Sequence, residues 1–224
     1  MVVNIALDGP SGSGKSTMAK RISRELGYYY IDTGALYRAL GLFVKREGIH
    51  PGDEAAVARG IETVKIGFCF LDGIQHTYLN GEDVSELIRS PEISDYASRA
   101  SSLCCVRAKL LGVQRCFAAE HNLIMDGRDI GTTVLPDAQI KLYLTADAAD
   151  RAHRRYEELL ERGEKVDYST VLSDIQARDA RDMARKISPL RQAEDAVLVE
   201  TTGLSLEEGY QKVRSVILSL LENL

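Results

Sequence analysis

The sequence contains Gly9-Pro10-Ser11-Gly12-Ser13-Gly14-Lys15-Ser16-Thr17, which matches the pattern G-x-x-x-x-G-K-S/T from Gly9 to Ser16. An apolar run at residues 2–7 precedes it, and a run with helical spacing at residues 17–26 follows it. Glycines in such a loop let consecutive backbone N–H groups turn toward a polyphosphate, and the next helix adds the positive end of its dipole. We therefore predict a phosphate-binding loop, with Lys15 directed at the β and γ phosphates and the Ser16 hydroxyl available to Mg²⁺.

Outside this loop, the spacing of the apolar residues alternates along the chain. Short runs typical of strands lie at residues 2–7, 28–31, 123–126, 140–144 and 196–200. The stretches between them have helical spacing, most clearly at residues 106–117 and 206–221. Such alternation is typical of parallel strands joined by crossover helices. The expected fold is therefore α/β, with helices flanking a five-stranded, doubly wound parallel sheet.

One stretch interrupts this alternation. Residues 64–71 and 74–79 form two alternating runs around the turn dipeptide Asp72-Gly73, and Asn80-Gly81 provides a second turn signal. This pattern predicts a small antiparallel insert, with approximate limits at residues 62 and 91, within a subdomain attached to the main sheet.

Length, composition and charge exclude several classes of protein. The chain has 224 residues and is 45% hydrophobic, which suffices for a real core. No run approaches the roughly 18 apolar residues of a membrane span, and the first residues do not resemble a secretion signal. Lys+Arg number 28 against Asp+Glu 33, whereas proteins that grip polymeric nucleic acid usually carry a basic surface. If the chain handles nucleotides, we expect free ones.

The cysteines indicate a reducing compartment. Cys69, Cys104, Cys105 and Cys116 include no C-x-x-C pair and have no histidine at ligand spacing. A zinc site is therefore not expected, and a chain of this size needs no disulfide framework. We predict reduced, mostly buried thiols and a cytosolic protein.

A carboxylate is expected opposite the phosphate loop. Asp126 closes an apolar run at a strand end, and open α/β sheets bind their ligands at the carboxyl edge of the strands. Asp126 could hold hydrated Mg²⁺ or the Ser16 hydroxyl. The alternative is a capping or turn role together with Gly127.

Basic residues gather in several motifs beyond the loop. Arg38 lies one turn inside a helix that Asp32 or Thr33 can cap, and Arg128 stands beside Asp129 after a strand end. Helical geometry brings Arg178, Asp182 and Arg185 to one face, with Arg181 beside them. Such a face is often only an exposed, salt-bridged surface. The phosphate loop in the same chain favours the other interpretation, in which guanidinium groups neutralise a transferring phosphoryl group.

Motifs in a fixed order carry a family resemblance. They are GPSGSGKST, DTGALYRAL, VRAKLLGVQR, MDGRDIGT and RDARDMARKISPL. Together they resemble the bacterial cytidylate kinases, from about Asn4 to the C-terminal helix. The resemblance implies a nucleoside monophosphate kinase fold on a P-loop NTPase core, a monophosphate-binding subdomain at residues 33–105 that contains the antiparallel insert, and a lid at residues 151–166. It also implies a monomeric, cytoplasmic enzyme of pyrimidine nucleotide metabolism.

The resemblance assigns roles to individual side chains. Catalysis is assigned to Lys15, Arg128 and Arg178, and the lid residue Arg154 is assigned to the donor phosphates together with the loop. The acceptor nucleotide is assigned to Thr33, Arg38, Ser98, Arg107, Arg128, Asp129, Arg178, Asp182 and Arg185. Within this set, Asp129 faces the cytosine, Asp182 the ribose hydroxyls and Arg185 the base region.

The implied reaction is ATP + CMP giving ADP + CDP, with Mg²⁺ accompanying ATP and dCMP as a second acceptor. A nucleotide phosphate is largely dianionic at neutral pH, so its oxygen needs no general base. Cytosine offers an N4–H₂ donor to the Asp129 carboxylate, whereas uracil presents the acceptor O4, so UMP is expected to be a poor substrate.

Three other classes share the phosphate loop. A nucleotide-dependent switch is disfavoured because the guanine-reading motif N-K-x-D is absent: no Asn is followed by Lys. A small-molecule kinase of the shikimate or nucleoside type is the closer rival. A non-catalytic nucleotide-binding module would bind without turnover. An acceptor panel with ATP and Mg²⁺ separates all three from a CMP kinase.

Overall fold

The computed structural model describes residues 2–224, which form two compact units: one consists of residues 3–28 and 123–224, and the other of residue 2 and residues 29–122. The main sheet has the strand order β2-β6-β1-β7-β8. Its strands are β1 (Asn4–Asp8), β2 (Tyr29–Asp32), β6 (Leu123–Gly127), β7 (Ile140–Thr145) and β8 (Val197–Glu200). β1 pairs in parallel with both β6 and β7, and β7 pairs in parallel with β8.

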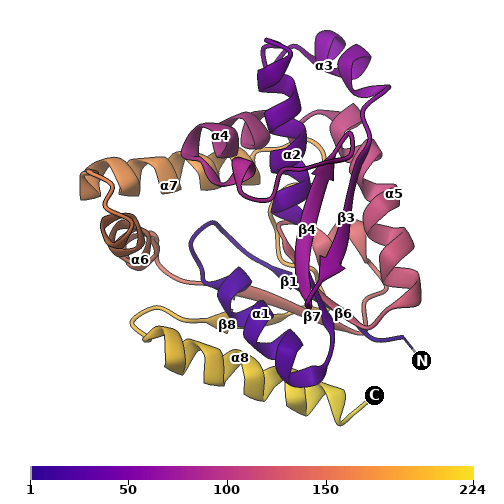
Figure 1. Cartoon of the computed structure of the whole chain (residues 1–224). Coiled ribbons are helices and arrows are strands. Elements are labelled where there is room, and N and C mark those ends of the chain that lie inside the picture. Colours follow the sequence, from indigo (N-terminus) through magenta and orange to yellow (C-terminus); the bar gives the residue numbers. More distant parts are fainter. Residues whose placement is uncertain (1) are drawn as a thin grey trace. The chain divides into compact units, whose positions relative to one another are not determined.

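The first unit also contains the helices α1 (Lys15–Leu26), α6 (Ala148–Glu161), α7 (Tyr168–Met183) and α8 (Leu206–Leu221). Of these, α1 and α8 lie beside its strands (Figure 1). Glycines in the left-handed conformation flank α1 at both ends, and a Ser205–Glu208 capping box starts α8. α8 packs closely on α1: a Cβ at Gly209 would lie 2.7 Å from Met18 Cε.

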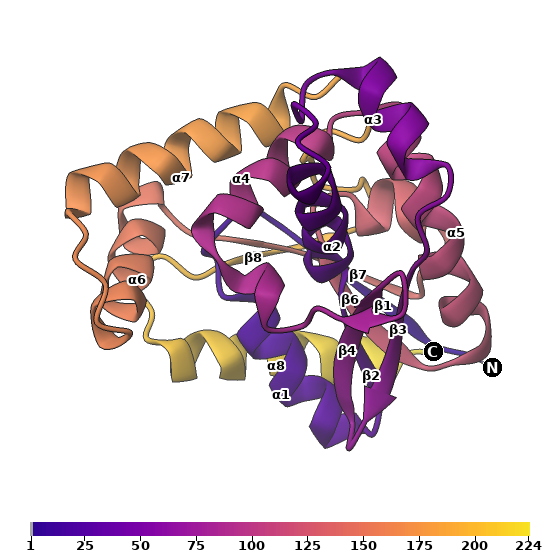
Figure 2. The same ribbon diagram turned by 45° about the horizontal axis from the view of Figure 1, so that its top comes forward.

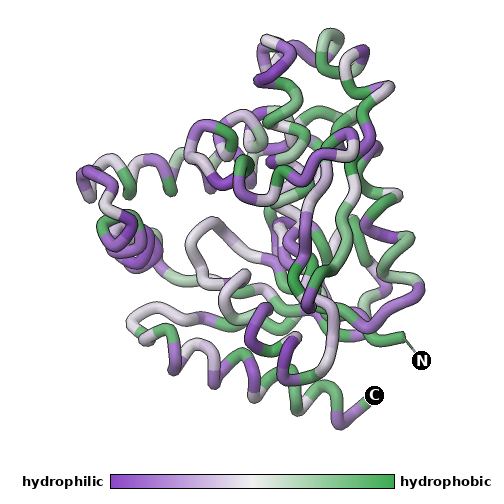
Figure 3. The backbone as a smooth tube through the Cα atoms, viewed as in Figure 1, coloured by the Kyte–Doolittle hydropathy of each residue, from purple (hydrophilic) through white to green (hydrophobic). Residues whose placement is uncertain are grey.

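The α6–α7 pair has its own small apolar core, formed by Ala152, Leu159, Val171 and Ile175. Figure 2 shows these two helices side by side. Figure 3 shows that α6 is mostly hydrophilic along its length, in contrast to the hydrophobic strands of this unit. Only a narrow stripe of α6 is therefore available for burial.

The second unit combines helices with a three-stranded sheet of order β3-β4-β5. Besides β2, its elements are α2 (Thr33–Arg46), α3 (Glu54–Ile61), β3 (Ile66–Leu71), β4 (Ile74–Leu79), β5 (Glu82–Asp83), the 3₁₀ turn η1 (Leu87–Arg89), α4 (Pro91–Ala100) and α5 (Cys104–Glu120). β3 and β4 pair antiparallel around Asp72 and Gly73, both of which have positive φ. Buried residues of α2, α3, α4 and α5, including Leu36, Leu40 and Leu110, form its core.

The predicted fold class is confirmed. Each predicted strand is present within two residues of its expected limits, and the antiparallel hairpin lies where its turn signals place it. No helix among residues 2–224 is long and apolar enough to cross a membrane.

The prediction that the cysteines are mostly buried is wrong. All of them are free, Cys104 and Cys116 are exposed, and Cys69 and Cys105 are half-buried. The buried side of α5 is formed by other residues, including Val106, Leu110 and Ala118, so Cys104 and Cys116 lie outside its packed face.

Candidate active site

The loop between β1 and α1 requires its glycines. Gly9 has φ 148°, and a Cβ there would lie 1.9 Å from the carbonyl oxygen of Leu144 on β7. Gly12 and Gly14 have φ 75° and 87°, in the left-handed region that favours glycine. The glycines of the motif are therefore required by the backbone geometry of the loop, as well as by the phosphate ligand that the motif predicts.

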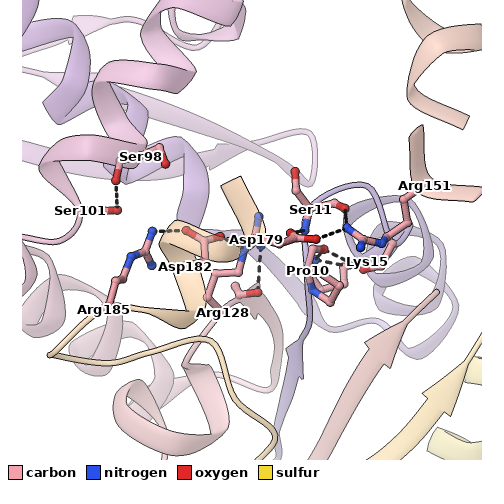
Figure 4. Close-up of polar contacts among 12 residues, drawn as sticks. Pro10, Ser11, Lys15, Ser98, Ser101, Arg128, Arg151, Asp179, Asp182 and Arg185 are labelled. Carbon is pink, nitrogen blue, oxygen red and sulfur yellow. Dashed lines mark hydrogen bonds and ion pairs between the residues drawn. The ribbon is translucent and has the colours of Figure 1, made fainter. Parts of the chain in front are cut away.

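Lys15 is buried within this loop. Its Nζ donates to the carbonyl oxygen of Pro10 at 2.6 Å and to Ser13 Oγ at 3.2 Å (Figure 4). Burial lowers the pKa of Lys15 well below its ordinary value, and the positive charge of Arg128 lowers it further. The loop therefore holds an ammonium group whose charge the surrounding protein does not fully compensate, as expected where an anionic ligand binds.

The structure joins Ser16 and Asp126, as one of the sequence interpretations expects. Ser16 Oγ donates to Asp126 Oδ2 at 2.7 Å, from the first turn of α1 to the carboxyl end of β6. A hydroxyl and a carboxylate are oxygen donors of the kind that Mg²⁺ prefers, so this pair fits a magnesium ion bound with a triphosphate.

A buried carboxylate on α7 organises two arginines. Arg128 Nε donates to Asp182 Oδ2 at 2.9 Å, and Arg185 Nη2 pairs with the other carboxylate oxygen (Figure 4). Burial acts to raise the pKa of Asp182, but Arg128 and Arg185 outweigh it and hold the pKa below its ordinary value. Two guanidinium groups around one carboxylate leave a net positive charge. The prediction of one helix face is wrong for Arg185, because α7 ends at Met183 and Arg185 reaches Asp182 from beyond the helix end. Arg178 lies one turn before Asp182 on the helix itself.

Asp8 is a site residue that the sequence interpretation missed. Its buried carboxylate accepts the backbone N–H groups of Ile130 at 2.8 Å and Gly131 at 2.7 Å. These residues begin the short π-helical turn η2 (Ile130–Val134), for which Asp129 is the N-cap residue but provides no side-chain cap. Asp8 therefore caps this turn from the neighbouring strand and fixes the backbone that carries Asp129. An acidic residue that closes an apolar strand directly before the phosphate loop was the signal available.

The burial of Asp8 predicts a pH dependence of stability. Burial raises its pKa from 3.8 to about 6 and Asp129 adds to this, against the lowering effects of the two backbone bonds and Lys15. Between about pH 4 and 6 the folded chain holds a proton that the unfolded chain has released, so stability falls as pH rises, by about 3 kcal/mol in total.

Urea unfolding of wild type and Asp8→Asn from pH 4 to 7 checks this. The free energy of unfolding of the wild type, minus that of the variant, should decrease across the window and then level off. A difference that does not change with pH would contradict the assignment.

Within residues 29–122, the helix α2 begins as predicted at a capped end. Asp32 accepts the backbone N–H of Ala35 at 3.0 Å and also binds Arg38 Nη2 at 2.8 Å. Thr33 is buried at the first position of the helix. Asp32 thus both caps the helix and orients the Arg38 guanidinium.

Ser98 and Arg107 are connected through Ser101. Arg107 Nη1 donates to the carbonyl oxygen of Ser101 at 3.2 Å, and Ser101 Oγ donates to that of Ser98 at 2.8 Å. The Ser98 hydroxyl is buried and has no hydrogen-bond partner within the described chain. A buried hydroxyl of this kind is costly unless water or a ligand satisfies it, and the role of Ser98 in acceptor binding stays a prediction.

Arg154 lies on α6 and is held by main-chain oxygens. Its Nη2 donates to the carbonyl oxygens of Thr201 at 2.8 Å and Leu204 at 3.1 Å, in the turn that precedes α8. The predicted contact of Arg154 with donor phosphates stays a prediction.

Phosphoryl transfer needs a site for a triphosphate and positive charge where the transferred group passes, and the fold and site together place this chain among the P-loop kinases. A family model described as "Cytidylate kinase" matches residues 5–219. The chain belongs to the cytidylate kinase family.

Individual relatives agree with this family. The cytidylate kinase of Caldicellulosiruptor bescii is 47% identical over 99% of this chain and 98% of its own length. That of Caldanaerobacter subterraneus subsp. tengcongensis is 49% identical over 97% of this chain and 95% of its own length. Among solved structures, a gluconokinase from Sinorhizobium meliloti aligns with a TM-score of 0.51 at 15% identity, covering 99% of this chain and 94% of that one, which supports the fold alone.

Proposed function

We propose that this protein transfers the γ-phosphoryl group of ATP, bound with Mg²⁺, to CMP or dCMP, giving ADP and CDP or dCDP. The observation that carries the proposal is the match to relatives named cytidylate kinase over nearly the whole of both chains. Buried Lys15 in a glycine-dependent loop and two arginines around Asp182 support it independently of those names.

The residues of this chain divide the work between donor and acceptor. The loop amides and Lys15 bind the donor phosphates, and Mg²⁺ supplies charge neutralisation when bound, with Ser16 and Asp126 as the residues that would hold it. Arg128 and Arg178 neutralise the transferring group, and the acceptor phosphate needs no base because it is already dianionic. Asp182 keeps Arg128 and Arg185 in place, so these two side chains lose less conformational entropy during the reaction.

The proposal extends to the organisation of the enzyme. Thr33, Arg38 and Ser98, within residues 33–105, and Arg107, just beyond them, bind the acceptor. Residues 151–166, which include Arg154, act as the lid that excludes water. We place this activity on a monomer in the cytoplasm, in pyrimidine nucleotide metabolism.

An acceptor panel tests the proposed function. Purified protein, ATP and Mg²⁺ are mixed with CMP, dCMP, UMP, AMP, GMP, shikimate or a nucleoside, and ADP release is measured. CMP and dCMP should give the highest kcat/KM. Turnover with shikimate or a nucleoside alone would instead assign a small-molecule kinase, and binding without turnover a nucleotide-binding module.

Asp129 is expected to select the base. Asp129 is buried two residues after the strand β6 ends, and an amide in its place could donate to uracil O4. Asp129→Asn should therefore lower the ratio of kcat/KM for CMP over UMP by about tenfold or more. The exposed Asp137→Asn serves as the control for the same change. Comparable kcat/KM for CMP and UMP in the wild type would contradict this role.

A further inference from the structure

A buried ion pair outside the reacting groups holds the phosphate loop. Arg151, in the first turn of α6, pairs through Nη1 with Asp179 Oδ2 on α7 at 2.6 Å. The same Nη1 donates to the carbonyl oxygen of Ser11 at 2.9 Å, and the Ser11 N–H approaches Asp179 Oδ1 at 3.4 Å (Figure 4). Ser11 is thus contacted at both its N–H and its C=O. We call this group of Ser11, Arg151 and Asp179 the Ser11 clamp.

The loop packs on Arg151 as well as bonding to it. A Cβ at Gly12 would lie 3.3 Å from both Cβ and the carbonyl oxygen of Arg151 and 3.6 Å from Cδ1 of Ile175. Glycine at this position therefore allows the loop to approach α6 and α7 closely. A further hydrogen bond from Arg151 Nε to the carbonyl oxygen of Ala146, at 2.8 Å, fixes the guanidinium at the start of its own helix.

Fold stability alone does not account for this pair. Arg151 and Asp179 are 5% and 7% exposed, and removing two charges from water is energetically unfavourable. Apolar side chains of similar volume are often as stabilising at buried positions. The apolar residues Val171 and Ile175 occupy the same side of α7, so the fold admits such side chains there. The charged pair is instead suited to making directional bonds to the loop backbone.

We propose that Arg151 and Asp179 are positioning residues for donor binding, holding the Ser11 peptide so that the loop keeps the backbone geometry a triphosphate requires. The inference rests on the proposed function only in taking ATP as the ligand of the loop. It also gives α6 and α7 a mechanical connection to the loop, because one residue of the clamp comes from each helix. Neither side chain has to contact the nucleotide.

The direction in which one substitution changes the affinity for ATP distinguishes this proposal from a simple electrostatic effect. Asp179→Asn removes a negative charge near a site for a polyanion, and by Coulomb's law alone ATP should then bind more tightly. ATP should also bind more tightly if Arg151 acted by contacting the donor directly, because the substitution would release Arg151 from Asp179. Positioning predicts the reverse, because an amide cannot replace both contacts of the carboxylate with Arg151 and with the Ser11 N–H.

Calorimetric titration with ATP and Mg²⁺, and separately with CMP, tests the proposal in the full chain. Asp179→Asn should weaken ATP binding by about 10- to 100-fold and change CMP binding by less than about twofold. The KM for ATP should rise more than kcat falls. Asp174→Asn makes the same change at an exposed position of α7 and should leave both affinities unchanged. Unchanged or tighter ATP binding by Asp179→Asn would overturn the proposal.

A double variant separates positioning from folding. Arg151→Met with Asp179→Leu replaces the pair by apolar side chains, which should keep the Tm close to that of the wild type. ATP binding should nevertheless remain weak, because methionine and leucine cannot bond to the Ser11 peptide. Wild-type ATP affinity in this variant would overturn the proposal. Because binding is measured without turnover, an error in the acceptor assignment would leave this comparison intact.

Discussion

Replacing Lys15 by methionine should lower kcat for CMP phosphorylation by about 100- to 1,000-fold or more. The Lys15 ammonium lies inside the phosphate loop, where it contacts Pro10 and Ser13. On the proposed mechanism it stabilises negative charge that spreads over the transferring phosphoryl group. Methionine is unbranched like lysine and only one atom shorter, but it carries no charge, so most of the packing is preserved while stabilisation of the transition state is lost.

The same substitution should not destabilise the fold. The pKa of Lys15 is lowered by burial and by Arg128, so at neutral pH the folded state binds this proton more weakly than the unfolded state does. The charge therefore costs stability at neutral pH, and the cost declines as pH rises toward the ordinary lysine pKa. We expect the Tm of Lys15→Met to equal or exceed that of the wild type. Lys20→Met, on an exposed position of the same helix, is the matched control for kcat. Near-normal turnover by Lys15→Met would refute the assignment.

Replacing Arg128 by methionine should have an effect on kcat of similar size, about 100- to 1,000-fold. Arg128 follows the strand β6, and its Nε donates to the buried carboxylate of Asp182. Together with burial, its positive charge lowers the pKa of Lys15. Arg128 therefore carries a guanidinium that is bonded to α7 and whose charge acts on the loop lysine. Asp182 keeps Arg185 as a partner in the variant, so we expect only a modest decrease in Tm.

Two further variants check the Arg128 assignment. Arg128→Lys retains the positive charge but not the planar fork, and should recover part of kcat without restoring it fully. Arg191→Met removes an arginine from an exposed position and should have no effect. Wild-type kcat in Arg128→Met, with CMP affinity also unchanged, would remove Arg128 from the mechanism.

Local sequence patterns predicted the elements of the fold but not their arrangement. The apolar spacing located the five strands of the main sheet and the hairpin because period and turn chemistry act over a few residues. It did not reveal that β1 lies between β6 and β7, because strand order depends on contacts between distant segments. Ser16 and Asp126 could be linked in advance because the loop that follows the first strand and the end of the strand with Asp126 were both expected at the carboxyl edge of one sheet.

The residues that support the site were harder to predict. Asp8 and Asp179 look like ordinary acidic residues, and their roles arise from backbone N–H groups that lie far away in the sequence. Arg151 was grouped with the lid arginines, whereas the structure buries it against the loop. The cysteines were misplaced because composition alone does not show which side of a helix is packed.

The place of β1 in its sheet has a consequence for biosynthesis. Both hydrogen-bonding edges of this apolar strand are satisfied by β6 and β7, whose residues begin at Leu123 and Ile140. A ribosome therefore releases β1 long before either neighbour exists, leaving an unprotected edge that can pair with other chains. Nascent chains arrested before residue 123 should thus aggregate or recruit chaperones, and competence to bind nucleotide should emerge only late in translation.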